Sequence, residues 1–151
     1  MIDPVVRVAD AGDRDQLIWL EELARAALSA QRGGELWLER HQEQSPEWAS
    51  AAAGNVLVAT IDEVVVGYLR HERIDTVFHV RDVFVHPDAR EVGFGDALLD
   101  AAIAVGRRDG ARRIEAEALP GDRDTKNLYE RAGITAKRIT VSSALDELDA
   151  R

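Results

Sequence analysis

The sequence predicts one α/β domain of the α+β type, spanning residues 1–151, on three observations. Apolar residues recur at helical spacing near the N-terminus, the middle of the chain changes to runs rich in β-branched residues, and a helical pattern returns after two closely spaced glycines. A chain of 151 residues with 46% hydrophobic residues is long enough to bury one core.

Each predicted element follows from local periodicity and from the residues at its ends. Asp13 or Asp15 is suited to cap the first helix, and Gly33 and Gly34 end it. The stretch 47–54 fits a helix or a loop. In chain order we expect a strand over 5–10, helices over 14–31 and 35–42, an antiparallel hairpin over 55–75 that turns at 61–63, a strand over 77–87, a helix over 96–110, a strand over 112–120, a helix over 124–133 and a last strand over 136–145.

Composition excludes several classes of protein. The 28 acids outnumber the 19 bases, and this net charge of −9 disfavours nonspecific binding to nucleic acid. The chain has no cysteine, so a thiolate nucleophile or a thiolate metal site is impossible, and we expect no metal. No apolar run is long enough to span a membrane, and acids stand where a signal peptide needs bases. We therefore expect a cytoplasmic protein without a membrane partner, as a monomer or homodimer.

Gly93 and Gly95 lie between a strand that stops at Pro87 and a helix that begins near Asp96. Such glycines either shape a tight turn or let backbone N–H groups at a helix start approach a phosphate. The chain lacks the Gly-Lys-Ser/Thr sequence of the Walker motif and the third glycine of the dinucleotide fingerprint. The common nucleotide-binding loops are therefore excluded.

Two motifs together resemble the GNAT superfamily of acyl-CoA-dependent N-acetyltransferases, with a detailed match over residues 80–134. The family's loop signature is Gln/Arg-x-x-Gly-x-Gly/Ala, and its later helix carries Leu-Tyr-Glu followed closely by Gly. The matching residues are Arg90, Gly93 and Gly95 in the loop, and Leu128, Tyr129, Glu130 and Gly133 in the helix.

The resemblance implies a mixed, mostly antiparallel sheet flanked by helices and an enzyme that uses acetyl-CoA as co-substrate. It implies that the backbone amides of residues 92–95 hold the pyrophosphate, and that N–H groups of residues 83–85 stabilise the oxyanion. The residues expected at the coenzyme are Val83, Phe84, Val85, Arg90, Glu91, Val92, Gly93, Phe94, Gly95, Asp96, Lys126 and Tyr129.

Several residues depart from the family pattern. Glu91 stands where the family often has glycine, and Val92 where a base is frequent. Glu91 and Asp96 should each oppose phosphate binding by a few tenths to about 1 kcal/mol. Asp122 replaces a common asparagine. Lys126, one helical turn before Tyr129, could replace a lost coenzyme contact, or it could be an ordinary solvated lysine.

The resemblance makes Tyr129 the acid that protonates the leaving thiolate. Simple alternation along the strand separates two faces. Some members of the family that the chain resembles place a glutamate or a histidine at the positions of Arg81 and His79. Arg81 cannot act as a base, so the resemblance leaves His79 as the general base. Glu115 and Glu117 are the second choice, or they form cross-strand pairs with Arg81 or Arg138. One face carries His79, Arg81, Val83 and Val85, and the other carries Val80, Asp82, Phe84 and His86.

The predicted function is transfer of an acetyl group from acetyl-CoA to a primary amine of a small molecule or a protein. The alternative is a non-catalytic acyl-CoA-binding or protein-interaction module of the same fold. Residues 1–60 hold ten acids and five bases, a balance of −5, so we expect a cationic acceptor. Trp19 and Trp37 lie at helical spacing among apolar neighbours and should pack in the core. The N-terminal glutamates are Glu21, Glu22, Glu35, Glu39, Glu43 and Glu47.

Overall fold

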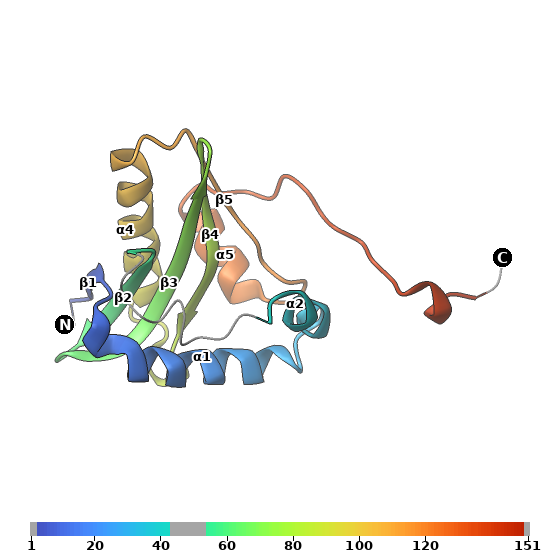
Figure 1. Cartoon of the computed structure of the whole chain (residues 1–151), viewed down its shortest axis with the longest axis horizontal. Coiled ribbons are helices and arrows are strands. Elements are labelled where there is room, and N and C mark those ends of the chain that lie inside the picture. The colour runs from blue at the N-terminus through green and yellow to red at the C-terminus, as the bar shows by residue number, and fades with distance from the viewer. Residues whose placement is uncertain (1–2, 43–53, 150–151) are drawn as a thin grey trace.

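The computed structural model describes residues 3–42 and 54–149, which fold around a five-stranded sheet with the strand order β1-β2-β3-β4-β5 (Figure 1). The first three pairings are antiparallel and the β4–β5 pairing is parallel, which confirms the mixed, mostly antiparallel sheet. The strands are β1 (Val5–Val8), β2 (Val56–Ile61), β3 (Val64–Ile74), β4 (Val77–Val85) and β5 (Arg113–Ala116).

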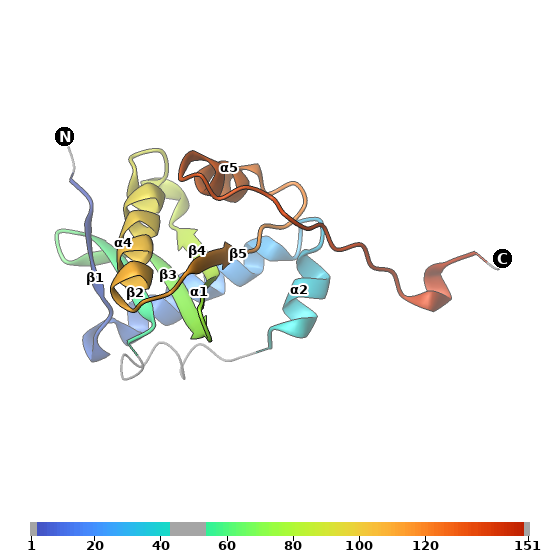
Figure 2. The same ribbon diagram turned by 90° about the horizontal axis from the view of Figure 1, so that it is seen from above.

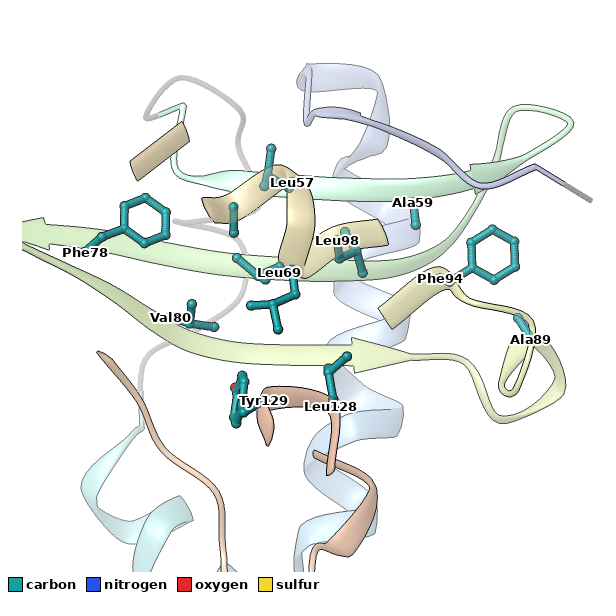
Figure 3. Close-up of a cluster of buried hydrophobic side chains, with 12 residues drawn as sticks. Leu57, Ala59, Leu69, Phe78, Val80, Ala89, Phe94, Leu98, Leu128 and Tyr129 are labelled. Carbon is teal, nitrogen blue, oxygen red and sulfur yellow. The ribbon is translucent and has the colours of Figure 1, made fainter. Parts of the chain in front are cut away.

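Helices cover both faces of this sheet (Figure 2). Adjacent residues of β2 face opposite sides: Leu57 lies in a cluster with residues of α4 and α5, and Val58 in a cluster with residues of α1. Figure 3 shows the first of these clusters, which holds Phe94 and Tyr129. The helices are α1 (Arg14–Leu28), α2 (Gly34–Arg40), α4 (Phe94–Arg108) and α5 (Arg123–Arg131).

The hairpin of β2 and β3 turns at Asp62 and Glu63, as the sequence predicts. Both residues have positive φ angles, 47° and 69°. Two consecutive left-handed residues form the turn whose twist matches that of the flanking strands. The hairpin therefore forms without the Asn-Gly pair that most often makes such a turn.

Asp13 precedes α1 as predicted, but its side chain does not cap that helix. The Asp13 carboxylate accepts two hydrogen bonds from the Arg7 guanidinium, at 2.6 and 2.8 Å, and one from the backbone N–H of Asp10. The hydrogen bond from Arg7 lowers the pKa of Asp13 despite its burial. Asp10 and Asp13 form a capping box around a short 3-10 turn that leads into α1.

Gly33 and Gly34 end α1 and start α2, also as predicted. Gly33 adopts a φ of 84°, and a Cβ on Gly34 would lie 1.8 Å from the carbonyl oxygen of Leu28. The side-chain amide of Gln31 donates a hydrogen bond of 2.9 Å to the carbonyl of Pro120. This contact joins the α1–α2 turn to the segment between β5 and α5.

The predicted last strand over 136–145 is wrong. Residues 135–144 have no regular secondary structure, and a short 3-10 turn follows at Leu145–Glu147. A strand requires backbone pairing, and the described sheet ends at β5. The stretch 47–54, left open between helix and loop, lies outside the described residues except for its last position.

The part of the chain that the structure describes contains no helix long and apolar enough to cross a membrane. Residues 3–42 and 54–149 also contain no group of three or more histidine or acidic side chains that could hold a metal ion.

Candidate active site

Strands β4 and β5 diverge after a short parallel ladder. The ladder joins residues 77–80 to 113–116, but β4 continues to Val85 while β5 ends at Ala116. In Figure 3 the side chains of Leu128 and Tyr129, on α5, lie beside this far part of β4. The edge of β4 over residues 81–85 therefore lies next to α5 and carries no parallel partner strand in the described sheet. This is the segment for which the resemblance implies oxyanion-binding N–H groups.

A β-bulge at Arg81 changes which side chains share a face of β4. On β3, Arg70 pairs with Asp82 and the next residue, His71, pairs with Val80, so Arg81 is the additional residue. An extra residue in one strand shifts the alternation of all side chains beyond it.

The predicted alternation along β4 is therefore wrong. Val80 packs in the cluster under α4, and after the bulge Val83 and Val85 pack against that same cluster. His79 and Asp82 therefore share the opposite face of β4, although alternation along the sequence placed them on different faces. Asp82, and not Arg81, is the strand residue that joins His79 there.

Arg90 fastens the loop that follows β4. Its Nε donates a hydrogen bond of 2.9 Å to the carbonyl oxygen of Val85, and its guanidinium carbon lies 5.4 Å from the ring centroid of Phe84. The Nε atom of Arg90, the arginine of the loop signature, thus holds the loop against the end of β4. The side chain of Arg90 is exposed, so its positive charge is accessible in the loop before α4.

The start of α4 has the geometry of an anion-binding site. Gly93 precedes the helix with a φ of 92°, and no side chain caps the first turn. Its carbonyl accepts the first helical hydrogen bond, from the N–H of Ala97 at 3.0 Å. The preceding N–H groups, of residues 94–96, have no earlier helical carbonyl to bind, and such groups attract anions. Gly93 is left-handed, as close approach of a loop to a ligand requires.

Gly95 and Asp96 connect α4 to α5. A Cβ on Gly95 would lie 3.4 Å from Cδ2 of Leu128, so the small residue also serves helix packing. Asp96 accepts hydrogen bonds from Nε and Nη2 of Arg131, at 3.1 and 3.2 Å. The Asp96 charge is therefore paired with a cation. Phe94 is 1% exposed and packs in the core, which leaves its backbone N–H for a ligand.

Glu91 has a φ of 67° and is one of the described non-glycine residues in the left-handed region. This conformation explains why the family often has glycine there, because glycine adopts it without steric cost. Glu91 and Val92 are both exposed between Arg90 and the start of α4. The Glu91 charge is thus the acid of this loop that a bound phosphate would meet.

Tyr129 is 6% exposed and lies in the cluster between the sheet, α4 and α5 (Figure 3). Burial raises the pKa of its phenol well above the ordinary value, and the charges of Asp82, Asp122 and Glu117 raise it further. The phenol is therefore protonated at every pH at which the protein would work. Asp82 on β4 and Glu117 after β5 are close enough to act on it electrostatically.

The ends of α5 account for the rest of the second motif. Asp122 caps the helix by accepting a hydrogen bond of 3.2 Å from the N–H of Thr125. Gly133 ends it with a φ of 84°, and the N–H of Ile134 donates to the carbonyl of Tyr129 at 3.0 Å. Asp122 and Gly133, at the two ends of α5, therefore fix the position of Tyr129. Lys126 is exposed and forms an ion pair with Glu130 at 3.7 Å.

A buried polar cluster under α1 was not predicted. The Arg70 Nε donates a hydrogen bond of 2.9 Å to Asp82, and the hydroxyl of the fully buried Tyr68 lies 3.4 Å from the same carboxylate. Asp82 and Glu21 both raise the pKa of Tyr68, after burial itself. The Asp82 side chain keeps 23% of its surface exposed. Glu21, which is 5% exposed, lies on the same helical stripe of α1 as Leu17 and Leu20. The helical spacing in the sequence could therefore have predicted its burial.

His79 lies opposite Glu72 on β3 and Glu115 on β5. Glu115 forms a 4.0 Å ion pair with Arg113, and Arg81 forms one with Glu72. The sequence predicts His79 as the general base. That role stays a prediction.

The prediction that Trp19 packs in the core is wrong. Its side chain is 50% exposed and stacks on His86, with ring centroids 5.2 Å apart. Trp37 is half-buried and stacks on His41 at 4.2 Å. The apolar stripe of α1 points Leu17 and Leu20 at the sheet, so Trp19 falls on its flank.

Comparison with known proteins agrees with this architecture. The sequence matches the Acetyltransferase (GNAT) family over residues 18–134. The chain belongs to the GNAT family. It is a GNAT-type N-acetyltransferase. No curated protein matches its sequence.

Solved structures of other acetyltransferases share the fold of this enzyme at low sequence identity. A ribosomal-protein-alanine N-acetyltransferase from Brucella melitensis biovar Abortus 2308 is 18% identical, with a TM-score of 0.67 over 95% of this chain and 99% of that one. The PaiA N-acetyltransferase from Thermoplasma acidophilum, in complex with coenzyme A, is 15% identical, with a TM-score of 0.69 over 87% and 89%. The diaminobutyrate acetyltransferase EctA from Paenibacillus lautus, in complex with its substrate and coenzyme A, is 16% identical, with a TM-score of 0.65 over 86% and 74%.

Proposed function

We propose that this enzyme transfers the acetyl group of acetyl-CoA to a primary amine of a small molecule or a protein. One observation carries the proposal: the divergence of β4 from β5 lies beside the buried phenol of Tyr129 and leads to the uncapped start of α4. Acetyl transfer from a thioester needs groups that stabilise the oxyanion and a proton for the leaving thiolate, and coenzyme A also carries phosphates that must be bound. Solved structures of the same fold include acetyltransferases in complex with coenzyme A.

The N–H groups at the start of α4 would hold the pyrophosphate. Gly93 lets the backbone approach, and the helix dipole favours an anion at this end. Arg90 supplies a nearby positive charge while its Nε stays on Val85. Glu91 weakens this site, and Asp96 weakens it less because Arg131 pairs with it.

The free edge of β4 would stabilise the oxyanion that forms when the amine attacks the thioester. Backbone N–H groups at such an edge need no reorganisation to bind developing negative charge. Tyr129 would donate a hydrogen bond to the leaving sulfur. Because burial raises the pKa of Tyr129, complete transfer of its own proton to a thiolate is unfavourable. The base would take the proton that the amine loses as the C–N bond forms, and Tyr129 would receive that proton while it gives its own to the sulfur. The C–S bond breaks, and the products are an amide, a thiol and a neutral phenol.

The base that accepts the amine proton would be one of three side chains. The charges of Asp82 and Glu117 both raise the pKa of Tyr129, which makes them candidates. His79 shares the Asp82 face of β4. We favour Asp82, because its side chain keeps 23% of its surface exposed and its carboxylate is held by Arg70 and the hydroxyl of Tyr68.

The acceptor would carry a positive charge, either on the reacting amine or close to it. Glu21 and Asp82 put two acids in the layer between α1 and the sheet, where Arg70 also lies. Glu43 and Glu47, which contribute to the predicted acidic balance, lie outside the described residues. Relatives of the same fold are named for acting on diaminobutyrate, aminoglycosides and a ribosomal protein.

The test is a transfer assay with acetyl-CoA and a panel of diamines, amino sugars and N-terminal peptides, with released thiol and acetylated product both measured. Tyr129→Phe keeps the ring and should lower kcat roughly 10- to 1,000-fold while coenzyme affinity, measured by calorimetry, stays within about twofold. Coenzyme binding with no turnover on any amine would instead support the non-catalytic module. No coenzyme binding would refute both.

A further inference from the structure

The turn between α1 and α2 contacts the segment that leads into α5. The side-chain amide of Gln31 donates a hydrogen bond of 2.9 Å to the carbonyl oxygen of Pro120, although the two residues lie 89 positions apart in the chain. Figures 1 and 2 show the two segments side by side. This contact is here named the Gln31 clip. It connects the α1 layer of the molecule to the segment that precedes the Tyr129 helix.

The backbone on both sides of the Gln31 clip fits closely. A Cβ on Gly121 would lie 3.1 Å from Nε2 of Gln31, and a Cβ on Gly33 would lie 3.3 Å from Cδ of Pro120. Both distances are tighter than ordinary van der Waals contact, so a side chain at either glycine would push the turn and the segment apart. The two glycines therefore leave the space that the clip needs.

The first half of α5 has little buried surface of its own. Residues 117–122, which precede the helix, form neither a strand nor a helix. None of residues 123–127 is buried, and the buried residues of α5 are Leu128 and Tyr129 in its second half. A helix of nine residues is too short to be stable by itself. The place of α5 in the molecule therefore depends on what its two ends are attached to.

The two ends of α5 are attached to different parts of the molecule. Near its C-terminal end, the hydrogen bonds from Arg131 to Asp96 attach it to α4. Near its N-terminal end, the Gln31 clip holds the chain two residues before the capping residue Asp122. Asp122 sets where the helix begins, and the clip sets where that beginning lies. Tyr129 is located between the two attachments.

We propose that Gln31 is a positioning residue for acetyl transfer: through the clip it fixes the start of α5, and with it the phenol of Tyr129, relative to the free edge of β4. The inference rests on the proposed function, because Gln31 acts through the proton donor of that reaction. A proton donor works only within hydrogen-bond reach of the leaving atom. Misplacement by about 1 Å can lower the rate about 100-fold.

Three variants of Gln31 test the hydrogen bond in a transfer assay. Gln31→Ala removes the donor, Gln31→Glu keeps the length of the side chain but offers the Pro120 carbonyl no proton, and Gln31→Lys restores a donor of similar reach. The first two should lower kcat about 5- to 100-fold, with KM for acetyl-CoA within about twofold of wild type, and Gln31→Lys should retain most of the wild-type kcat. A wild-type kcat in Gln31→Ala, or no rescue by Gln31→Lys, would overturn the proposal.

The matched control is Ser29→Ala, in the same turn. The Ser29 hydroxyl donates a hydrogen bond to the carbonyl of Ala26, so this substitution removes a contact that stays within α1. It should leave kcat unchanged. A loss equal to that of Gln31→Ala would mean that any disturbance of the turn lowers activity, which is contrary to a specific role of the clip.

A double variant separates positioning of Tyr129 from a general loss of structure. If Gln31 acts through the phenol, Gln31→Ala should change kcat less than about twofold in the Tyr129→Phe background, because the group that it positions is already absent. An equal loss in the wild-type and Tyr129→Phe backgrounds would show that Gln31 does not act through Tyr129.

Amide hydrogen exchange tests the clip without measuring activity. In Gln31→Ala the amides of α5 should exchange at least about tenfold faster than in wild type, whereas those of α4 should not change, and Ser29→Ala should match wild type in both helices. If the wild-type enzyme turns over no amine, the proposed function fails and the exchange data alone decide whether the clip holds α5. Unchanged exchange of α5 in Gln31→Ala would refute the clip whatever the kinetic result.

Discussion

Arg131 on α5 binds both carboxylate oxygens of Asp96 in the first turn of α4, at 3.1 and 3.2 Å. The pair joins the two helices that carry the phosphate-loop start and Tyr129. It also neutralises an acid that the sequence alone suggests would repel a phosphate. Both side chains are about half exposed, at 49% and 56%, so the pair contributes modestly to stability.

Asp96→Asn and Arg131→Gln should therefore each lower the free energy of unfolding by about 0.2–1 kcal/mol, and the double variant should lose little more than either. The measurement is a double-mutant cycle from urea denaturation at low and high salt. Additive losses would show that the two side chains do not act as a pair. Removal of an unpaired acid would tighten coenzyme binding. Because Arg131 pairs with Asp96, Asp96→Asn should leave the affinity for coenzyme A nearly unchanged.

Asp82 and His79 can be separated by the pH dependence of kcat/KM. Burial raises the pKa of Asp82, with Arg70 opposing the shift. A carboxylate acts as a base only when deprotonated, so activity should rise with pH through that raised pKa. Asp82→Asn should remove this acidic limb and His79→Gln should keep it, if Asp82 is the base.

Stability must be followed in the same variants. Asp82→Asn removes the charge that accepts the hydrogen bond from Nε of Arg70, a residue that is 8% exposed, and should cost about 1–3 kcal/mol of unfolding free energy. His79→Gln changes a half-buried residue and should cost less. If the acidic limb of the kcat/KM profile disappears only with His79→Gln, then His79 is the base.

The parts of this site that the sequence predicts are local, and the parts it misses depend on pairing. Gly93 and Gly133 are needed by the left-handed backbone at two helix ends, so a short motif predicts them. The bulge at Arg81 exists only because β3 and β4 pair in one register, and nothing within β4 alone indicates it. The predicted strand over 136–145, which the structure does not contain, is the same kind of error. Its β-branched residues fit a strand, but a strand also needs a partner, which the described chain does not supply.

His71 should make stability depend on pH. Its ring stacks on Phe78 with centroids 4.7 Å apart, it is 8% exposed, and its Nε2 is buried without a hydrogen bond in the described structure. Burial lowers the pKa of His71, and Asp109 opposes this only in part. Below the unfolded pKa of about 6.5 the unfolded chain binds a proton that the folded chain resists, so His71 reduces stability as pH falls.

His71→Phe keeps a ring on Phe78 and removes the titrating group. The unfolding free energy of this variant relative to wild type should therefore increase as pH falls from 7.5 to 5, by at most about 1.4 kcal/mol per pH unit. Urea denaturation at several pH values measures the difference. His41→Phe, at the histidine that stacks on Trp37 outside the sheet, is the matched control. A difference that does not change with pH would refute a buried, proton-resisting His71.

Glu91→Gly should improve both stability and coenzyme binding, for separate reasons. Glu91 has a φ of 67°, and glycine adopts this region without the cost of about 1 kcal/mol that an L side chain has there. The greater freedom of glycine in the unfolded chain offsets part of this gain. The substitution also removes the exposed acid of the loop that precedes the proposed pyrophosphate site, so affinity for coenzyme A should rise several-fold at low salt and less at high salt. Glu91→Gln is the control: it removes the charge but keeps the side chain in the left-handed region, so it should tighten binding without stabilising the fold. If both variants bind coenzyme A with wild-type affinity at low ionic strength, Glu91 does not face the phosphates.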